Sequence, residues 1–174
     1  MSRAVRLTVN GRPATLDVDD HEILLDVLRA QLGLYSVREG CGVGLCGACT
    51  VLLDGAPVSS CLLLTARLEG RAVTTVEGLG TERALHPVQA AFLEAGALQC
   101  GYCTPGLILS VAALFREFPD PPPETVRHYL SGNLCRCCAY PDIVRAVALA
   151  REKLAPATGP ADLAAAPASS DVSG

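Results

Sequence analysis

Cysteine is the residue type in this chain that could carry most chemistry, since nine cysteines stand among its 174 residues. Three of them, Cys41, Cys46 and Cys49, fall within the segment CGVGLCGACT. The first residues, MSRAVRLTVNGRP, form no apolar signal segment, so we expect a cytoplasmic location, where thiols stay reduced. Disulfides would suit a secreted chain, whereas clustered thiols in a reducing compartment indicate metal ligands or redox groups.

The first cysteine group has the spacing C-x4-C-x2-C, which is typical of the [2Fe–2S] cluster of plant-type ferredoxins. Cys61 is the candidate fourth ligand, although it follows Cys49 by 12 residues, sooner than in those ferredoxins. Four glycines surround these thiols: Gly40, Gly42, Gly44 and Gly47. Glycine permits positive φ and close backbone approach, so backbone N–H groups can point at the sulfurs and offset the charge of four thiolates.

The second group follows the pattern C-x2-C, a long gap, then C-x-C. Its members are Cys100, Cys103, Cys135 and Cys137. Each half of the group directly precedes a predicted helix, one starting near Pro105 and the other near Pro141. Helix N-termini favour negative charge, which suits a centre that gains an electron. Four thiolates could also bind tetrahedral zinc, so spacing alone leaves zinc and a two-iron cluster both open.

The elements that position the first group are predicted to be strands and one helix. Apolar residues alternate on both sides of the dipeptide NG at positions 10–11, which is typical of a two-residue hairpin turn. A helical pattern follows over residues 23–28. Asp19 or Asp20 is its expected N-cap, and Gly33 is its expected end.

Strands resume after the cysteine loop, with a hairpin around residues 54–55 and a further strand within residues 72–78. The second half of the chain has helical periodicity instead. Its helices are expected to begin at Pro87, Thr104, Glu124 and Tyr140. Four helices with short links predict a small bundle. From residue 156 to 174 the chain is rich in Ala, Pro and Ser, which predicts a disordered tail.

Three segments carry a family likeness: GCGVGLCGACTVLLDG, LHPVQAAFLEAGALQCGYCTPG and SGNLCRC. Together they resemble the small iron–sulfur subunit of the molybdenum hydroxylases, the xanthine oxidase and aldehyde oxidoreductase family. The likeness runs from about residue 4 to 153. It implies an α+β fold, with an N-terminal β-grasp, plant-type ferredoxin-like domain over residues 1–78. A C-terminal four-helix bundle over residues 79–155 would follow, and each domain would hold one [2Fe–2S] cluster.

The resemblance also implies a function. The chain would be the iron–sulfur subunit of an oxidoreductase complex, with no substrate-converting residue of its own. It would carry electrons from a molybdopterin centre on a large subunit to FAD on a medium subunit, in a heterotrimer or a dimer of heterotrimers. The cluster ligands would be Cys41, Cys46, Cys49 and Cys61, then Cys100, Cys103, Cys135 and Cys137. Gln99 and Cys137 match positions that approach the pterin ring.

Several alternatives remain open at this stage. A carbon monoxide dehydrogenase-type small subunit, a free-standing ferredoxin-like carrier and a zinc-stabilised interaction module would each use part of the pattern. The substrate pocket would lie on another chain, and the CGVGLCGAC loop favours N-heteroaromatics or purines, or else aldehydes. A net charge of −4 and seven aromatic residues argue against nucleic-acid binding, and no apolar run is long enough to span a bilayer.

The ninth cysteine, Cys138, stands outside both groups. The family usually has threonine and glycine before an aromatic residue, where this chain has Cys138, Ala139 and Tyr140. Adjacent residues of an extended segment point to opposite sides, so Cys137 and Cys138 are not expected to serve one small cluster together. We therefore predict that Cys138 is not a ligand and is shielded from solvent in the assembled complex.

Overall fold

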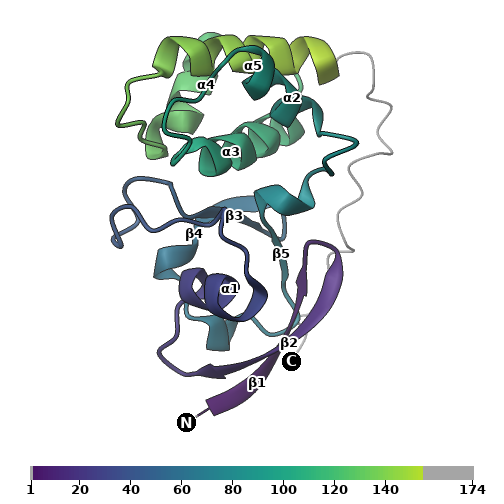
Figure 1. The fold of residues 1–174 in the computed structure, drawn as a ribbon, viewed down its shortest axis with the longest axis vertical. Helices are drawn as coiled ribbons and strands as arrows, with labels where there is room; N and C mark the ends of the chain where they lie inside the picture. Colours follow the sequence, from purple (N-terminus) through teal and green to yellow (C-terminus); the bar gives the residue numbers. More distant parts are fainter. Residues whose placement is uncertain (1, 155–174) are drawn as a thin grey trace, which may run out of the picture.

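The computed structural model describes residues 2–154, and the predicted disordered tail from residue 156 lies outside this range. Strands occupy one half and most helices the other (Figure 1). The strands are β1 (Ser2–Val9), β2 (Arg12–Asp19), β3 (Thr50–Leu53), β4 (Ala56–Ser59) and β5 (Ala72–Thr74). The helices are α1 (Leu24–Leu32), α2 (Pro87–Glu94), α3 (Thr104–Glu117), α4 (Pro123–Tyr129) and α5 (Tyr140–Leu154).

The five strands form one mixed sheet in the order β2-β1-β5-β3-β4. β1 pairs antiparallel with β2 and parallel with β5, and β3 pairs antiparallel with β4 and β5. Both predicted hairpin turns are confirmed, because Asn10 and Asp54 have φ of 51° and 48° and each precedes a glycine with positive φ. Such left-handed pairs match the twist of the flanking strands and fix their register.

Helix α1 lies across the sheet, and Leu24, Leu25 and Leu28 are buried in the same core as the inward side chains of β1 and β2. The predicted aspartate N-cap is wrong: neither carboxylate at 19–20 caps the helix, and the N-cap is Ile23, which makes no side-chain capping bond. The N–H of Leu24 instead donates to the Leu63 carbonyl at 2.8 Å. A backbone carbonyl that is distant in the sequence thus accepts a hydrogen bond from an N–H of the first helical turn. Gly33 ends α1 as predicted, with φ 65°.

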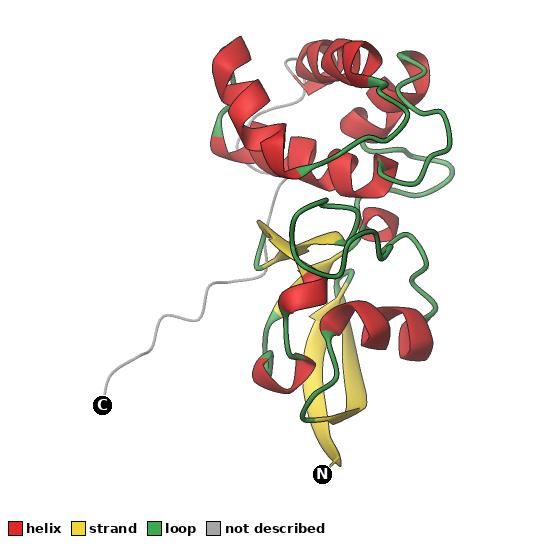
Figure 2. Ribbon diagram, turned by 90° about the vertical axis from the view of Figure 1, so that its left-hand side faces the viewer, coloured by secondary structure: helices red, strands yellow, loops and turns green. Residues whose placement is uncertain are grey.

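The helical half packs α2, α3, α4 and α5 around a second core (Figure 2). Phe92 of α2 and Leu114 of α3 are almost fully buried at its centre. His86 caps α2, because its ring nitrogen accepts the N–H of Val88 at 3.2 Å, and the side chain of Gln89 completes a capping box. The four predicted helices are therefore present, each beginning within a residue of its expected position.

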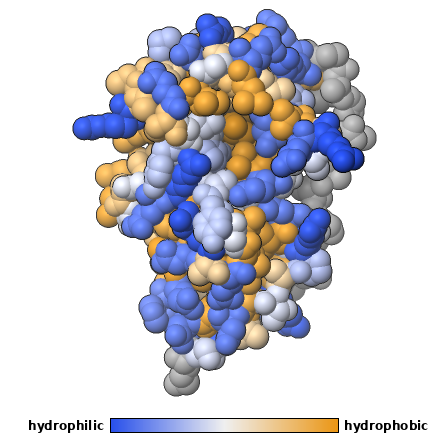
Figure 3. Space-filling view, in the orientation of Figure 1, coloured by the Kyte–Doolittle hydropathy of each residue, from blue (hydrophilic) through white to orange (hydrophobic). Residues whose placement is uncertain are grey.

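The two halves are joined by direct packing. Leu52 of β3 packs against Leu109 and Ala113 of α3 in a small buried cluster. Beside it, the side chain of Asn133 donates to the Gly47 carbonyl at 3.2 Å. Apolar and hydrophilic side chains are interspersed over both halves on the face shown in Figure 3. This junction fixes the loop of the first cysteine group against the helical half.

Candidate metal centres

The first cysteine group comes together where the loop after α1 meets the turn after β4. Cys41 and Cys46 lie in the loop, Cys49 directly precedes β3, and Cys61 lies in a short 3-10 turn. The closest thiol contacts join Cys41 to Cys46 and Cys49 to Cys61, and the charge of Cys41 also acts on Cys61. The structure therefore brings all four predicted residues of this group together.

Backbone N–H groups converge on the first group. The amides of Val43 and Leu45 lie 3.5 and 3.3 Å from the Cys41 sulfur. The N–H of Val43, followed by those of Cys46 and Leu45, lowers the pKa of Cys41 to about 7. Burial, followed by the Cys49 thiol, raises the pKa of Cys61 to about 11. The site thus favours a thiolate at Cys41, where backbone N–H groups converge, and a neutral thiol at the buried Cys61.

The glycines of this loop leave no room for side chains. Gly42, Gly44 and Gly47 all have positive φ, between 67° and 76°. A Cβ on Gly40 would lie 2.6 Å from the Cys46 sulfur. A cradle of this shape, lined by backbone donors, fits an anionic sulfur cluster.

The second cysteine group forms at the ends of helices. Cys100 follows α2, Cys103 is the N-cap of α3, and Cys135 and Cys137 lie in the turn before α5. The closest thiol contacts join Cys100 to Cys137 and Cys103 to Cys135, and the charge of Cys100 also acts on Cys103. The residues predicted for this group are therefore also brought together.

The electrostatics of the second group repeat those of the first. The N–H of Tyr102, followed by the Cys137 thiol, lowers the pKa of Cys100, and the charge of Arg38 acts in the same direction. Burial, followed by the Cys135 thiol, raises the pKa of Cys103 to about 12. Each group thus combines one thiol whose pKa backbone N–H groups lower with one thiol whose pKa burial raises.

A backbone hydrogen bond connects the two groups. The N–H of Leu134 donates to the carbonyl of Cys46 at 2.9 Å, and Leu134 directly precedes Cys135. Sequence reasoning missed this contact, because nothing in the spacing relates residues so distant in the chain. The two thiol groups are consequently neighbours across the junction of the two halves.

The donor set fits iron–sulfur clusters. Each group offers four thiols in two pairs, and a [2Fe–2S] cluster needs two thiolates on each of two irons. Among residues 2–154, no group of three or more Cys, His, Asp or Glu side chains is already arranged as a site for a metal ion. The backbone donors and the glycine cradle suit the negative charge of such clusters.

The remaining predicted residues lie near the second group. Gln99 is exposed and directly precedes Cys100. Cys138 is exposed too, and its backbone is not extended as expected, because its φ is 59° and its N–H donates to the Cys135 carbonyl at 3.3 Å. A tight turn, rather than strand geometry, therefore separates Cys138 from Cys137.

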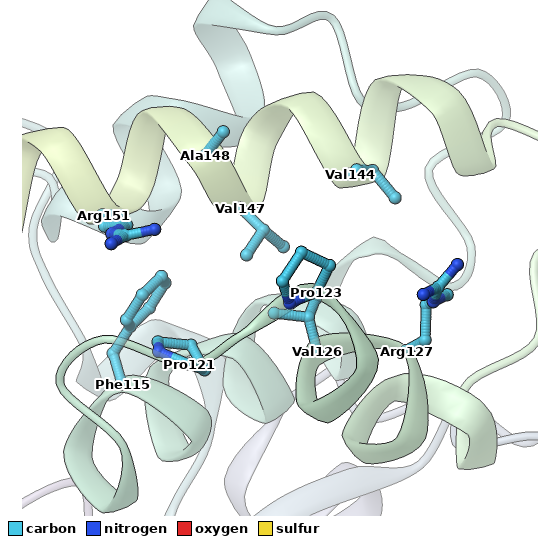
Figure 4. A pocket seen from close by; sticks show the side chains of 9 residues that line it. All are labelled: Phe115, Pro121, Pro123, Val126, Arg127, Val144, Val147, Ala148 and Arg151. Atoms are coloured by element: carbon cyan, nitrogen blue, oxygen red, sulfur yellow. The ribbon is translucent and has the colours of Figure 1, made fainter.

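A groove elsewhere on the helical half contains none of the cysteines. It encloses about 290 Å³ between α5, α4 and the end of α3, with Val147 and Val126 among its apolar walls and Arg127 and Arg151 beside them (Figure 4).

No helix in the described part of the chain is long and apolar enough to cross a membrane.

Two family models match the chain, one in each half. The 2Fe-2S iron-sulfur cluster binding domain matches residues 7–76, and the [2Fe-2S] binding domain matches residues 75–148. The matched segments contain all eight cysteines of the two groups.

The chain is also similar to individual proteins. The nicotinate dehydrogenase small FeS subunit of Eubacterium barkeri is 44% identical over 151 residues, which are 87% of this chain and 96% of the relative. Aldehyde oxidoreductase from Desulfovibrio desulfuricans superposes with a TM-score of 0.85 and 46% identity over 88% of this chain, which spans 17% of that longer chain. Quinoline 2-oxidoreductase from Pseudomonas putida 86 gives a TM-score of 0.83 and 39% identity, over 88% of this chain and 97% of that chain.

Proposed function

The chain belongs to the [2Fe–2S] iron–sulfur subunits of the molybdenum hydroxylase family, and on that premise we propose that it is the electron-transfer subunit of such a complex. It passes electrons from a molybdenum–pterin centre on a partner towards a flavin or another acceptor. The observation that carries the proposal is the arrangement of eight thiols as two neighbouring groups of two pairs. When bound, each cluster supplies a one-electron carrier.

We assign the ligands of the two clusters to the two cysteine groups. The first would be held by Cys41, Cys46, Cys49 and Cys61, and the second by Cys100, Cys103, Cys135 and Cys137. The pairing of the thiols supports this assignment. Backbone N–H groups stabilise the charge, and the turn at Cys138 leaves that residue outside the ligand set.

The exposed residues around the cysteines support a role inside a larger complex. Leu45 and Leu62 beside the first group are 69% and 60% exposed, and Leu134 beside the second is 53% exposed. Large apolar side chains gathered at a site are typical of a surface that a partner covers. We propose two kinds of partner, a large subunit with molybdopterin and a medium subunit that binds FAD, in a heterotrimer or a dimer of heterotrimers. Gln99 and Cys137 would lie towards the pterin.

The substrate of the complex is proposed to be an N-heteroaromatic compound. The names of nicotinate dehydrogenase and quinoline 2-oxidoreductase favour this class, whereas aldehyde oxidoreductase keeps aldehydes as the alternative. No residue of this chain is proposed to convert substrate. Activity of the purified complex towards nicotinate, quinoline and benzaldehyde would separate the two classes.

Metal content and spectroscopy test the proposed function. The purified complex should contain about four iron atoms per copy of this chain, and reduction should give two rhombic electron paramagnetic resonance signals. The protein should co-purify with a much larger subunit, which a free-standing ferredoxin-like carrier would not do. A content of about two iron atoms and one zinc ion per chain would overturn the two-cluster proposal.

A further inference from the structure

The side chain of Arg38 reaches from the first half of the molecule to the second cysteine group. Its backbone belongs to the first loop, because the Arg38 N–H donates to the Ala48 carbonyl at 3.3 Å. Its guanidinium donates to the carbonyl of Gly101 and lies 5.3 Å from the centre of the Tyr102 ring. A cation held in this way lies next to the segment that joins Cys100 to Cys103.

The contact is reciprocal. The hydroxyl of Tyr102 donates to the carbonyl of Glu39 at 2.5 Å, so the second loop also holds the first. We call Arg38, Glu39, Gly101 and Tyr102 the arginine clasp. Its two hydrogen bonds and its cation–π contact fix the guanidinium in one position, which an unrestrained surface arginine would not keep.

The charge of Arg38 is not neutralised within the described residues. None of the ion pairs found among residues 2–154 includes it. Its guanidinium is partly buried, so solvent screens its field less than that of an exposed cation. Arg136, the other arginine near this group, is exposed between Cys135 and Cys137. The clasp therefore supplies the fixed, partly desolvated positive charge beside the second group.

We propose that Arg38, a residue of the first half of the chain, stabilises the reduced form of the second iron–sulfur centre through its positive charge. Adding an electron makes that centre more negative, and a fixed cation beside Cys100 favours the added charge. The inference rests on the proposed function, because it requires a redox centre at the second cysteine group. It also gives the junction of the two halves a role in setting the order of the two potentials.

The test is a redox titration of the purified complex, followed by electron paramagnetic resonance at each potential. In Arg38→Gln, the ratio of reduced to oxidised second centre at a fixed ambient potential should fall about tenfold, which is about 59 mV for one electron. The first centre should shift by less than about twofold, because the guanidinium binds Gly101 and its charge acts on Cys100, whereas it is not among the groups that act on Cys41. Arg38→Lys should retain most of the wild-type ratio, since it keeps the charge.

Arg116→Gln is the matched control, because Arg116 also crosses between the halves, donating to the Gly55 carbonyl away from the cysteines. It should leave both centres unchanged. If Arg38→Gln loses iron, the titration is repeated on Arg38→Met, a neutral variant that can still pack on the Tyr102 ring. Loss of the second centre from both neutral variants would overturn the proposal, because Arg38 would then hold the centre in the protein without tuning its potential.

Other outcomes would overturn the inference. These are an unchanged second centre in Arg38→Gln, equal shifts of both centres, an Arg38→Lys variant that behaves like Arg38→Gln, or loss of both centres together. The failure of the proposed function is distinguishable, because it would appear in the wild-type complex as the absence of a second signal. If the wild-type complex gives two signals and the Arg38 variants leave both potentials unchanged, only the role of Arg38 is overturned.

Discussion

The two cysteine groups reach the same arrangement of thiols by different local structures. The first group depends on a loop whose glycines adopt positive φ and expose backbone N–H groups to the sulfurs. The second depends on helix ends, since Cys103 is the N-cap of α3 and a tight turn precedes α5. The first site is therefore built by backbone conformation and the second by helix packing. Substitutions should damage them in different ways.

The thiols themselves show what the two groups share. In each, one cysteine has a lowered pKa because backbone N–H groups point at it, as at Cys41 and Cys100. In each, burial raises the pKa of a second cysteine, as at Cys61 and Cys103. The glycine loop and the helix ends thus both provide backbone N–H donors on one side of the site and a buried environment on the other. Such surroundings tune the potential of an iron–sulfur centre.

The largest expected effects come from removing one ligand of each group. Because Gln99 and Cys137 are proposed to lie towards the pterin, the second centre would receive electrons first and pass them to the first centre. Cys49→Ser should therefore lose about two iron atoms and one of the two resonance signals, while substrate can still reduce the second centre. Cys103→Ser should remove the other signal and stop electron exit earlier. Iron analysis and single-turnover reduction of the flavin measure both effects. Wild-type flavin reduction in Cys49→Ser would show that electrons bypass the first half.

Thiol reactivity in the iron-free protein compares the two environments directly. At pH 8, iodoacetamide should modify Cys41 more than about 30-fold faster than Cys103, because only Cys41 is largely thiolate. The lowered pKa of Cys41 also means that its thiolate favours the fold above its unfolded pKa, and this contribution is lost as the pH falls through about 7. Peptide mass spectrometry gives the rates.

Urea-unfolded protein is the control for the thiol measurement. Both cysteines should then react at similar rates, because burial and the backbone donors are gone. Equal rates in the folded protein would contradict the contrast between exposed and buried thiols. A pKa of about 7 limits the fall in the Cys41 rate between pH 8 and pH 6 to about tenfold, so a fall of about a hundredfold, typical of an unshifted thiol, would contradict its lowered pKa.

Local signals predicted most of the elements, and distant contacts explain what was missed. The turns at 10–11 and 54–55 and the end of α1 at Gly33 depend on neighbouring residues, and the sequence predicts them correctly. The predicted N-cap of α1 was wrong because the group that accepts the hydrogen bond of its first N–H, the Leu63 carbonyl, lies about forty residues away in the sequence. Hydrophobic periodicity carries no information about such a partner.

The candidate site divides in the same way. The cysteine spacings predicted which thiols come together, because each short motif places two or three thiols in one turn or loop, although the contact of Cys103 with Cys135 crosses a long gap in the chain. The spacings could not predict the arginine clasp or the bond from Leu134 to Cys46, since each joins the two halves. Asn133 was overlooked as well, although it stands within the SGNLCRC segment. Its buried amide reveals its role only once Gly47 lies opposite.

A side chain where α3 contacts the loop of the first cysteine group should lower the stability of the fold. Gly106 lies in the first turn of α3, and a Cβ there would collide with the Gly47 carbonyl. Gly106→Ala should lower the free energy of unfolding by about 1–3 kcal/mol, because backbone cannot move aside as a flexible side chain can. Urea denaturation measures this. Gly132→Ala is the control, since nothing lies within 4 Å of its Cβ; a cost below about 0.5 kcal/mol at Gly106 would contradict close packing of the two frames.

The smallest expected effect concerns Cys138. This residue lies in the second cysteine group but has the left-handed backbone conformation that glycines adopt in the first group. A left-handed φ of 59° costs a residue with a Cβ about 1–2 kcal/mol, of which glycine returns part as unfolded-state entropy. Cys138→Gly should therefore raise the free energy of unfolding by about 0.5 kcal/mol. Threonine, by contrast, would be strained there, because β-branched residues resist positive φ.

Gly96→Ala provides the reverse comparison for Cys138→Gly. Gly96 has φ 61°, and nothing lies within 4 Å of its Cβ, so the substitution should cost about 1 kcal/mol through backbone strain alone. Cys138→Gly should also keep about four iron atoms and both resonance signals, because Cys138 is proposed to be no ligand. If the second signal disappeared in Cys138→Gly and persisted in Cys137→Ser, the ligand assignment would be wrong by one residue, and the turn at Cys138 would belong to the metal site itself.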